Sequence, residues 1–195
     1  MKFVAQKNMG EILRALKQGK IVAVPTETVY GLAVRADDIK AIDKLLTLKN
    51  RNGRSNKILT MMVADVEQIK EYANMTRKME NLARHFLPGE LTVIMPKKKS
   101  FRHDYFDYFE TIGFRIPRHR YMLNLLKKSG PLLVTSANLK GEEPCITSRE
   151  VKARVPGVDV IVNGKARGGL PSTVVDLSKE DPVIRRQGGL LIVHY

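Results

Sequence analysis

The sequence predicts a single α/β domain, because stretches with helical periodicity alternate with short apolar runs rich in β-branched residues. Its 195 residues, of which 43% are hydrophobic and 28% charged, match the usual size of one globular domain with a real core. No internal repeat or long linker interrupts this alternation. These observations favour one domain over residues 1–195, of α/β or α+β class, rather than a helical bundle or a β-sandwich.

The first elements are a helix, a strand and a second helix. The first helix begins near Asn8, ends at Gly19 and carries an apolar side made of Ile12, Leu13, Ala15 and Leu16. The apolar run 20–24 then stops at Pro25, which is typical of a buried strand. Asp38 can cap a second helix with an apolar side that extends to Leu48. This helix leads directly into a polar run at 49–57.

The remainder of the chain continues the alternation. We expect helices at about 65–73 and 76–86, and strands at 58–63, 91–95, 111–116, 131–135, 159–162, 173–177 and 182–186. Segment 97–109 is first basic and then aromatic and has no clean period, so it is predicted to be a surface loop. Its cations and rings can stack on nucleic-acid bases, or its phenylalanines can simply anchor the loop to the core.

The composition argues against a membrane protein and against a protein-held transition metal. No run of about eighteen apolar residues is present. Residues 1–7 lack the apolar part of a secretory signal, so we expect a cytoplasmic location. Cys145 is the only cysteine and the four histidines are scattered, which excludes an internal disulfide and gives no metal-ligand spacing. Cys145 is expected to be a small packed residue or a surface thiol.

The formal net charge of +14 favours a polyanionic ligand, either nucleic acid or nucleotide phosphate, although a lysine-rich composition can also serve solubility alone. Neither of the usual glycine-rich phosphate-binding motifs occurs. In an extended stretch Lys49 and Arg51 can project to the same side and grip a triphosphate, or they can belong to a solvated face.

Polar side chains follow two of the predicted strands. Ser136 and Asn138 come at the end of an apolar run, and ligands of α/β sheets bind at strand ends. They can bind phosphate or ribose, or form an ordinary turn. Thr26, Thr28 and Tyr30 follow the strand that ends at Pro25, where their hydroxyls can receive a small polar substrate or merely belong to a sheet-edge turn.

Together and in order, these segments resemble the YrdC family, the TsaC-type L-threonylcarbamoyladenylate synthases. Residues 25–32, Pro-Thr-Glu-Thr-Val-Tyr-Gly-Leu, are similar to the opening signature of the family, and the Lys-x-Arg and Ser-x-Asn pairs are similar to its tetrad. Further blocks agree at 87–92, 113–117, 172–176 and 186–188. The resemblance covers nearly the whole chain and is closest to the short form of the family. Thr60 stands where many long-form relatives have a histidine near the threonine.

The resemblance implies a twisted open mixed sheet with a basic concave cleft that binds ATP, L-threonine and bicarbonate. It implies a nucleotidyltransferase that releases pyrophosphate and makes threonylcarbamoyl-AMP for N6-threonylcarbamoyladenosine at tRNA position 37. Mg²⁺ would be carried with the nucleotide and not by a metal site of the protein. Transferred by position, the substrate residues are Thr26, Thr28, Tyr30, Arg115 and Ser172. The ATP residues are Lys49, Arg51, Ser136, Asn138 and Arg186, with Lys49 and Arg51 also catalytic.

Two questions remain open at the level of sequence. Glu27 can act as a general base, or it can cap a backbone group or pair with a neighbouring cation. The implied partners are the downstream tRNA threonylcarbamoyl transferase complex and, by direct contact, tRNA or double-stranded RNA. The alternative function is an RNA- or ribosome-binding protein of the same fold without synthase activity.

Overall fold

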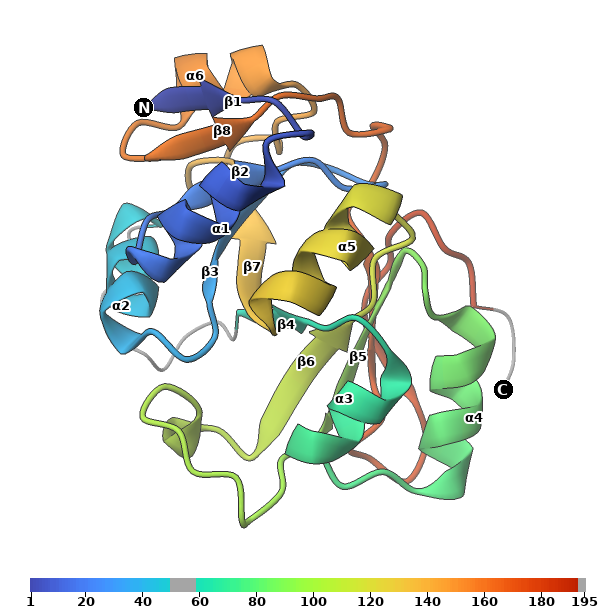
Figure 1. Cartoon of the computed structure of the whole chain (residues 1–195). Helices are drawn as coiled ribbons and strands as arrows, with labels where there is room; N and C mark the ends of the chain where they lie inside the picture. The colour runs from blue at the N-terminus through green and yellow to red at the C-terminus, as the bar shows by residue number, and fades with distance from the viewer. Residues whose placement is uncertain (50–58, 193–195) are drawn as a thin grey trace.

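Ten strands form one mixed sheet within residues 1–49 and 59–192, the part of the chain that the computed structural model describes (Figure 1). Their order across the sheet is β1-β8-β2-β3-β7-β4-β6-β5-β9-β10. Both parallel pairs, such as β4 with β6, and antiparallel pairs, such as β3 with β7, occur. The strands are β1 (Lys2–Val4), β2 (Val22–Val24), β3 (Gly31–Arg35), β4 (Thr60–Met62), β5 (Leu91–Pro96), β6 (Thr111–Arg115), β7 (Leu132–Ser136), β8 (Val160–Val162), β9 (Thr173–Asp176) and β10 (Val183–Arg186).

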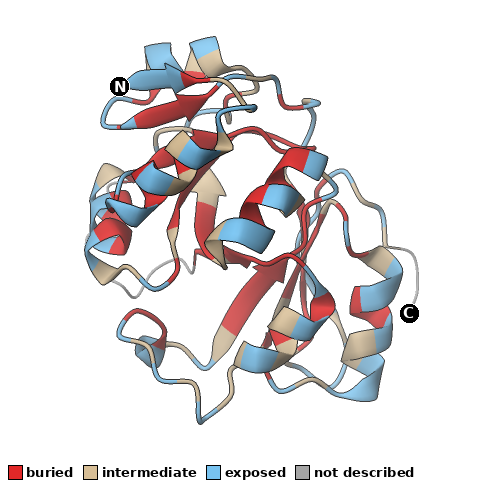
Figure 2. Ribbon diagram, in the orientation of Figure 1, coloured by how far each residue is buried: buried red, intermediate tan, exposed pale blue. Residues whose placement is uncertain are grey.

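Helices lie on both sides of this sheet, and the sheet separates the core into two clusters. The helices are α1 (Met9–Lys17), α2 (Ile39–Leu48), α3 (Val66–Tyr72), α4 (Arg77–Phe86), α5 (Arg120–Ser129) and α6 (Ser148–Arg154), with a short 3-10 helix at Phe106–Tyr108. Because side chains alternate along a strand, Val22 and Val24 pack with α1 and α5, whereas Ala23 belongs to the larger cluster on the other side. The buried stripes of α1 and α5 face the sheet and their exposed sides face solvent (Figure 2).

The predicted elements with clear periodicity are confirmed, with small changes at their ends. Asp38 caps α2 by accepting the backbone N–H of Ala41 at 3.0 Å. Asn8 occupies the N-cap position of α1, but its side chain makes no capping hydrogen bond. Besides the short 3-10 helix, four elements are absent from the prediction, namely β1, β3, α5 and α6. Strand β3 follows directly on the segment of Thr26, Thr28 and Tyr30 and extends from Gly31 to Arg35.

Segment 97–109 is anchored to the core by its aromatic rings. Phe106 is fully buried, and the Phe101 ring meets the Tyr72 ring edge-on with 5.0 Å between centroids. The Lys97 ammonium donates to the carbonyl oxygen of Phe106 at 2.9 Å. Of the two interpretations of this segment, the contacts favour anchoring, although Tyr108 is 69% exposed.

The single cysteine of the chain lies in the core. Cys145 is buried, which confirms the interpretation as a packed residue, and burial raises the pKa of its thiol.

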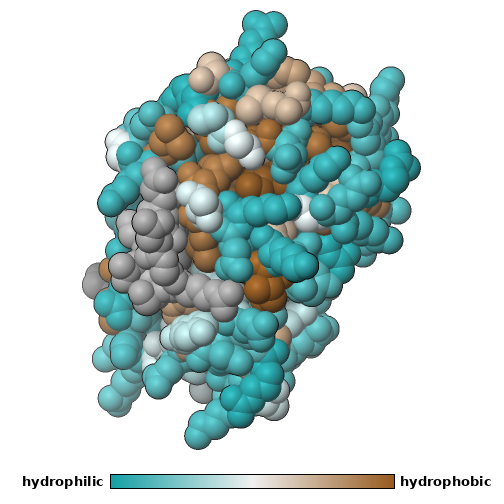
Figure 3. Space-filling model, turned by 90° about the vertical axis from the view of Figure 1, so that its left-hand side faces the viewer, coloured by the Kyte–Doolittle hydropathy of each residue, from teal (hydrophilic) through white to brown (hydrophobic). Residues whose placement is uncertain are grey.

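No helix in the described ranges has both the length and the apolar character needed to cross a bilayer. On the face drawn in Figure 3, hydrophilic side chains predominate and apolar atoms appear in patches between them.

Candidate active site

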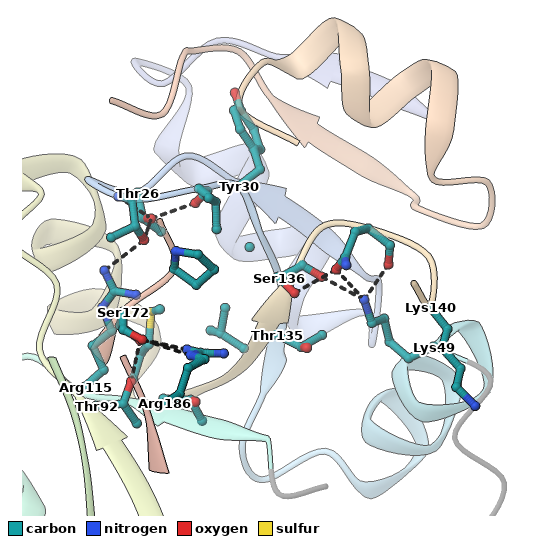
Figure 4. A pocket seen from close by; sticks show the side chains of 18 of the residues that line it. Thr26, Tyr30, Lys49, Thr92, Arg115, Thr135, Ser136, Lys140, Ser172 and Arg186 are labelled. Atoms are coloured by element: carbon teal, nitrogen blue, oxygen red, sulfur yellow. Dashed lines mark hydrogen bonds between the residues drawn. The ribbon is translucent and has the colours of Figure 1, made fainter. Parts of the chain in front are cut away.

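A cavity of about 730 Å³ opens where β3, β4, β6 and β7 meet β5, β9 and β10 (Figure 4). Apart from Thr135, the lining residues from these strands lie on one face of the sheet. Thr60 and Met62 are alternate residues of β4 and therefore point to the same side. Thr60 pairs with Val134 of β7. Met62 pairs with Arg115 of β6, so the register continues this face across the sheet.

The cavity is basic. Among the described residues that line it, the charged side chains are all cationic, and they are Lys49, Arg115, Lys140 and Arg186. Hydroxyl and amide groups of threonine, serine and asparagine residues lie between them. Such a lining can bind an anion through charge and orient it through hydrogen bonds. The described residues contain no group of three or more His, Cys, Asp or Glu side chains able to hold a metal ion.

One end of the cavity is built around Lys49, the C-cap residue of α2. Its ammonium donates to the carbonyl oxygen of Ser136 at 3.0 Å, to the carbonyl oxygen of Asn138, and to the Asn138 side-chain oxygen at 2.8 Å. The Ser136 hydroxyl donates to the same side-chain oxygen at 2.7 Å. The structure therefore brings Lys49, Ser136 and Asn138 together, although Lys49 and Ser136 are 87 residues apart in the sequence.

Backbone hydrogen bonds hold the loop after β7 in place at this end. The N–H of Ala137 donates to the Tyr30 carbonyl at 2.8 Å, and the N–H of Tyr30 donates to the Cys145 carbonyl at 2.8 Å. The N–H of Cys145 in turn donates to the Ala137 carbonyl at 2.9 Å. Cys145 thus supports the site through its backbone and not through its thiol.

The opposite end is built around Arg115 and the buried turn after β2. One amino group of Arg115, Nη2, donates to Glu27 Oε1 at 2.8 Å and to the Thr28 hydroxyl at 3.0 Å. The Thr26 hydroxyl donates to the Val29 carbonyl at 2.6 Å and accepts the N–H of Thr28 at 3.1 Å. These bonds hold the turn in its shape, because the Thr26 hydroxyl makes hydrogen bonds to two backbone groups of the turn.

Ser172 and Arg186 complete this end from the far edge of the sheet. The Arg186 guanidinium donates to the Ser172 carbonyl from Nε at 3.0 Å and from Nη2 at 2.8 Å. The Ser172 hydroxyl lies 2.9 Å from the Thr92 hydroxyl. Burial, together with the nearby positive charge of Arg115, lowers the pKa of Arg186. Two guanidinium groups that repel each other in this way favour an anion between them.

The Sua5/YciO/YrdC family model, described as telomere recombination, matches residues 14–188. The chain belongs to this family.

Its relatives include both longer proteins and proteins of similar length. A threonylcarbamoyl-AMP synthase of Vibrio vulnificus strain YJ016 is 35% identical over 187 residues, which cover 93% of this chain and 98% of the relative. A threonylcarbamoyl-AMP synthase of Pyrococcus abyssi is 34% identical over 179 residues, which cover 90% of this chain. The chain spans about half the length of that second relative, 52%. The solved structure of P. abyssi Sua5 complexed with L-threonine superposes with a TM-score of 0.87 at 31% identity, covering 97% of this chain and 57% of Sua5.

The Tyr30 hydroxyl, which the sequence suggests as a substrate-binding group, is engaged elsewhere. Tyr30 lines the cavity, but its hydroxyl points away from it and donates to the Val162 carbonyl at 2.8 Å (Figure 4). Burial raises the pKa of this phenol to about 12. The hydroxyl is thus already bonded to β8, and Tyr30 offers the cavity its ring and backbone.

The other predicted residues of the family signature line the cavity. These are Thr26, Thr28, Lys49, Arg115, Ser136, Asn138, Ser172 and Arg186. Arg51 lies outside the described residues, as do Asn52 and the rest of 50–58. Thr60, at the position of the long-form histidine, also lines the cavity.

Several cavity residues were missed by sequence reasoning. Lys140 follows Asn138 by two residues, so its charge could have been noticed beside the Ser-x-Asn pair. Thr92 lies in a strand that was predicted, yet nothing in its local sequence indicates which face it occupies. Gly31 permits the close approach of β3 and β7, since a Cβ there would lie 2.6 Å from Val134 Cγ1. Gly188 has a similar role, because a Cβ would lie 2.1 Å from the Pro171 carbonyl oxygen.

Proposed function

We propose that this chain is a threonylcarbamoyl-AMP synthase that makes L-threonylcarbamoyladenylate from ATP, L-threonine and bicarbonate and releases pyrophosphate. The observation that carries the proposal is that one basic cavity collects both predicted sets of residues, the Lys49 set and the Arg115 set. The names of the relatives support the same reaction, and one of them was solved with L-threonine. The product would serve the threonylcarbamoyl modification of tRNA at position 37.

We assign the Lys49 end to ATP. Lys49, Ser136 and Asn138 offer an ammonium, a hydroxyl and an amide at the end of β7, and phosphate groups are bound by such donors. Arg51, in the segment outside the described residues, would add a guanidinium group to the phosphates. Arg186, which is bonded to Ser172 at the Arg115 end, would reach the phosphates from across the cavity. The nucleotidyltransferase class follows from this assignment, since the adenylyl group is the part transferred.

We assign the Arg115 end to L-threonine and bicarbonate. A guanidinium binds a carboxylate or bicarbonate through its planar N–H groups, and the neighbouring hydroxyls can accept from the substrate amine or hydroxyl. The residues at this end are Thr26, Thr28, Arg115 and Ser172, with the ring and backbone of Tyr30 as part of the wall.

The reaction needs no covalent intermediate on the protein. The threonine amine attacks bicarbonate to form a carbamate with loss of water, and a carbamate oxygen then attacks the α-phosphorus as the bond to pyrophosphate breaks. Positive side chains stabilise the charge that gathers on the leaving group, which is the contribution of Lys49 and Arg51. Mg²⁺ would enter with the nucleotide, because its ligands would be phosphate oxygens and water, and it would neutralise part of the phosphate charge.

The biological setting follows from the product. A mixed anhydride of this kind is consumed by a transferase that acts on tRNA, so a downstream tRNA threonylcarbamoyl transferase complex is the expected partner in the cytoplasm. The surplus of cations supports a second candidate, an RNA- or ribosome-binding protein of the same fold. The two functions are compatible, since the charges extend beyond the cavity.

The test is a direct assay of the purified chain. Incubation with ATP, L-threonine, bicarbonate and Mg²⁺ should yield pyrophosphate and a threonylcarbamoyl adenylate detected by mass spectrometry. Omission of any one of the three substrates should abolish the adenylate. If L-threonine and bicarbonate change nothing, while RNA binds with a steep dependence on salt, the RNA-binding function replaces the synthase.

A further inference from the structure

The carboxylate of Glu27 is enclosed by protein beside the cavity. Glu27 is 2% exposed and does not belong to the cavity lining. Its Oε1 accepts from Arg115 Nη2 at 2.8 Å and from the backbone N–H of Arg118 at 3.0 Å. Its Oε2 is buried and has no hydrogen-bond partner. A general base must reach the proton that it removes, and this carboxylate is turned into the protein instead.

The contact with Glu27 determines which edge of Arg115 faces the cavity. Arg115 is 5% exposed, and both of its described hydrogen bonds, to Glu27 and to Thr28, come from Nη2. Nε is buried without a partner, and Nη1 makes no hydrogen bond with the described part of the chain. Arg115 lines the cavity, and with Nη2 held by Glu27 and Thr28, the Nη1 group is the one left to meet a ligand there.

We propose that Glu27 is a positioning residue for the substrate carboxylate or bicarbonate: it holds Arg115 by Nη2 so that Nη1 is presented to the anion. This inference rests on the proposed function for the identity of the anion, but the orientation of Arg115 can be measured without it. Glu27 also offsets the positive charge of Arg115, which lies close enough to Arg186 to affect that second guanidinium. The Glu27–Arg115 pair therefore orients a bound anion by hydrogen bonding more than it attracts the anion by net charge.

The test variant is Glu27→Gln, which keeps the shape and removes the charge. In steady-state kinetics the KM for L-threonine should rise about ten- to a hundredfold, because a small misplacement of a binding group has effects of that size. The kcat should stay within about threefold, since the lost interaction binds the substrate and takes no part in a proton transfer in the transition state. In an Arg115→Lys background the same change should add nothing to KM, because Glu27 acts through Arg115.

Asp176→Asn is the matched control. Asp176 is 5% exposed, pairs with Arg185 at 2.7 Å and is not part of the cavity lining. A merely structural loss of a buried carboxylate's charge should appear in both variants as lower stability, while only Glu27→Gln raises the KM. If Glu27→Gln does not fold, Glu27→Asp keeps the charge at a shorter reach, and a smaller rise in KM is expected.

The orientation itself is followed by NMR of the arginine side-chain Nε–H groups, with the Arg115 signal assigned by its loss in Arg115→Lys. The signal should belong to an ordered side chain in the wild type and become averaged in Glu27→Gln. An ordered Arg115 in that variant overturns the inference, and so does a fall in kcat at unchanged KM, which would make Glu27 the base. Absence of adenylate from the wild type would instead reject the proposed function and leave the NMR result to decide on Glu27.

Discussion

The two ends of the cavity hold their cations in different ways. At one end Lys49 extends from the end of α2 and donates to the carbonyl oxygen of Ser136, the last residue of β7, and to Asn138 in the loop after it. At the other end Arg115 projects from β6, in the middle of the sheet order, and donates to a buried carboxylate. The partners of Lys49 are neutral oxygens, so an anionic ligand can compete for the ammonium, whereas the guanidinium of Arg115 cannot leave Glu27 without leaving an unpaired buried charge.

This difference separates two tasks that one reaction needs. The Lys49 end must accept a triphosphate and release pyrophosphate, which suits an ammonium whose protein partners are neutral. The Arg115 end must hold small anions in one orientation, which suits a fixed planar group. We therefore expect substitutions at Arg115 to affect folding and substrate binding together, and substitutions at Lys49 to affect nucleotide binding with little effect on folding.

The largest expected effect is that of Arg115→Ala. The substitution leaves the Glu27 carboxylate buried without its cation, so the free energy of unfolding should fall by about 3–5 kcal/mol. Urea unfolding measures this loss. Arg185→Ala is the control, because Arg185 is half exposed and its removal should cost less than about 1 kcal/mol. Equal losses in the two variants would mean that the Arg115 end is no more rigid than the sheet edge.

Lys49→Ala should have an intermediate effect on binding. Loss of charge-assisted hydrogen bonds worth about 1.5–3 kcal/mol corresponds to a roughly ten- to hundredfold weaker affinity for ATP, measurable by calorimetry. Lys140→Ala removes an exposed cavity lysine and should change the affinity by less than about threefold. Arg51→Ala is expected to resemble Lys49→Ala. Unchanged ATP affinity in both would show that the nucleotide does not use this end.

Tyr30→Phe should have the smallest effect and should concern stability alone. The variant loses the bond to the Val162 carbonyl, worth about 1 kcal/mol in urea unfolding, while the KM for L-threonine stays unchanged. A raised KM would mean that the hydroxyl turns to the substrate after all.

The same tyrosine should also give a pH dependence. The pKa of about 12 in the folded protein lies above the ordinary value of about 10 for an unfolded chain. The folded state thus favours the neutral phenol, and its contribution is complete below about pH 10 and declines from there up to about pH 12. Unfolding measured at neutral pH and at about pH 11 should show a steeper loss in the wild type than in Tyr30→Phe.

Local patterns were sufficient for much of the fold. The apolar period of α2 and the capping Asp38 are visible in the sequence, and the structure confirms both. Helix α5 also has a helical period, with Tyr121, Met122, Leu125 and Leu126 buried, but it begins at a histidine cap that the usual start signals do not include. Strand β1, three residues long, is defined by its pairing with β8 and has too little local pattern to be found.

The chemical types in the cavity were set by the sequence itself, because residue identity and order are enough to place Lys49, Ser136, Asn138 and Arg115 in a family. Only the tertiary structure decided their orientations. Glu27 and Arg115 are 88 residues apart, and Tyr30 and Val162 are 132 apart, so no local pattern couples them. Sheet register fixes which face each side chain occupies, and burial then requires most polar groups to find a partner. That requirement turned the Tyr30 hydroxyl away from the cavity and the Arg115 guanidinium toward Glu27.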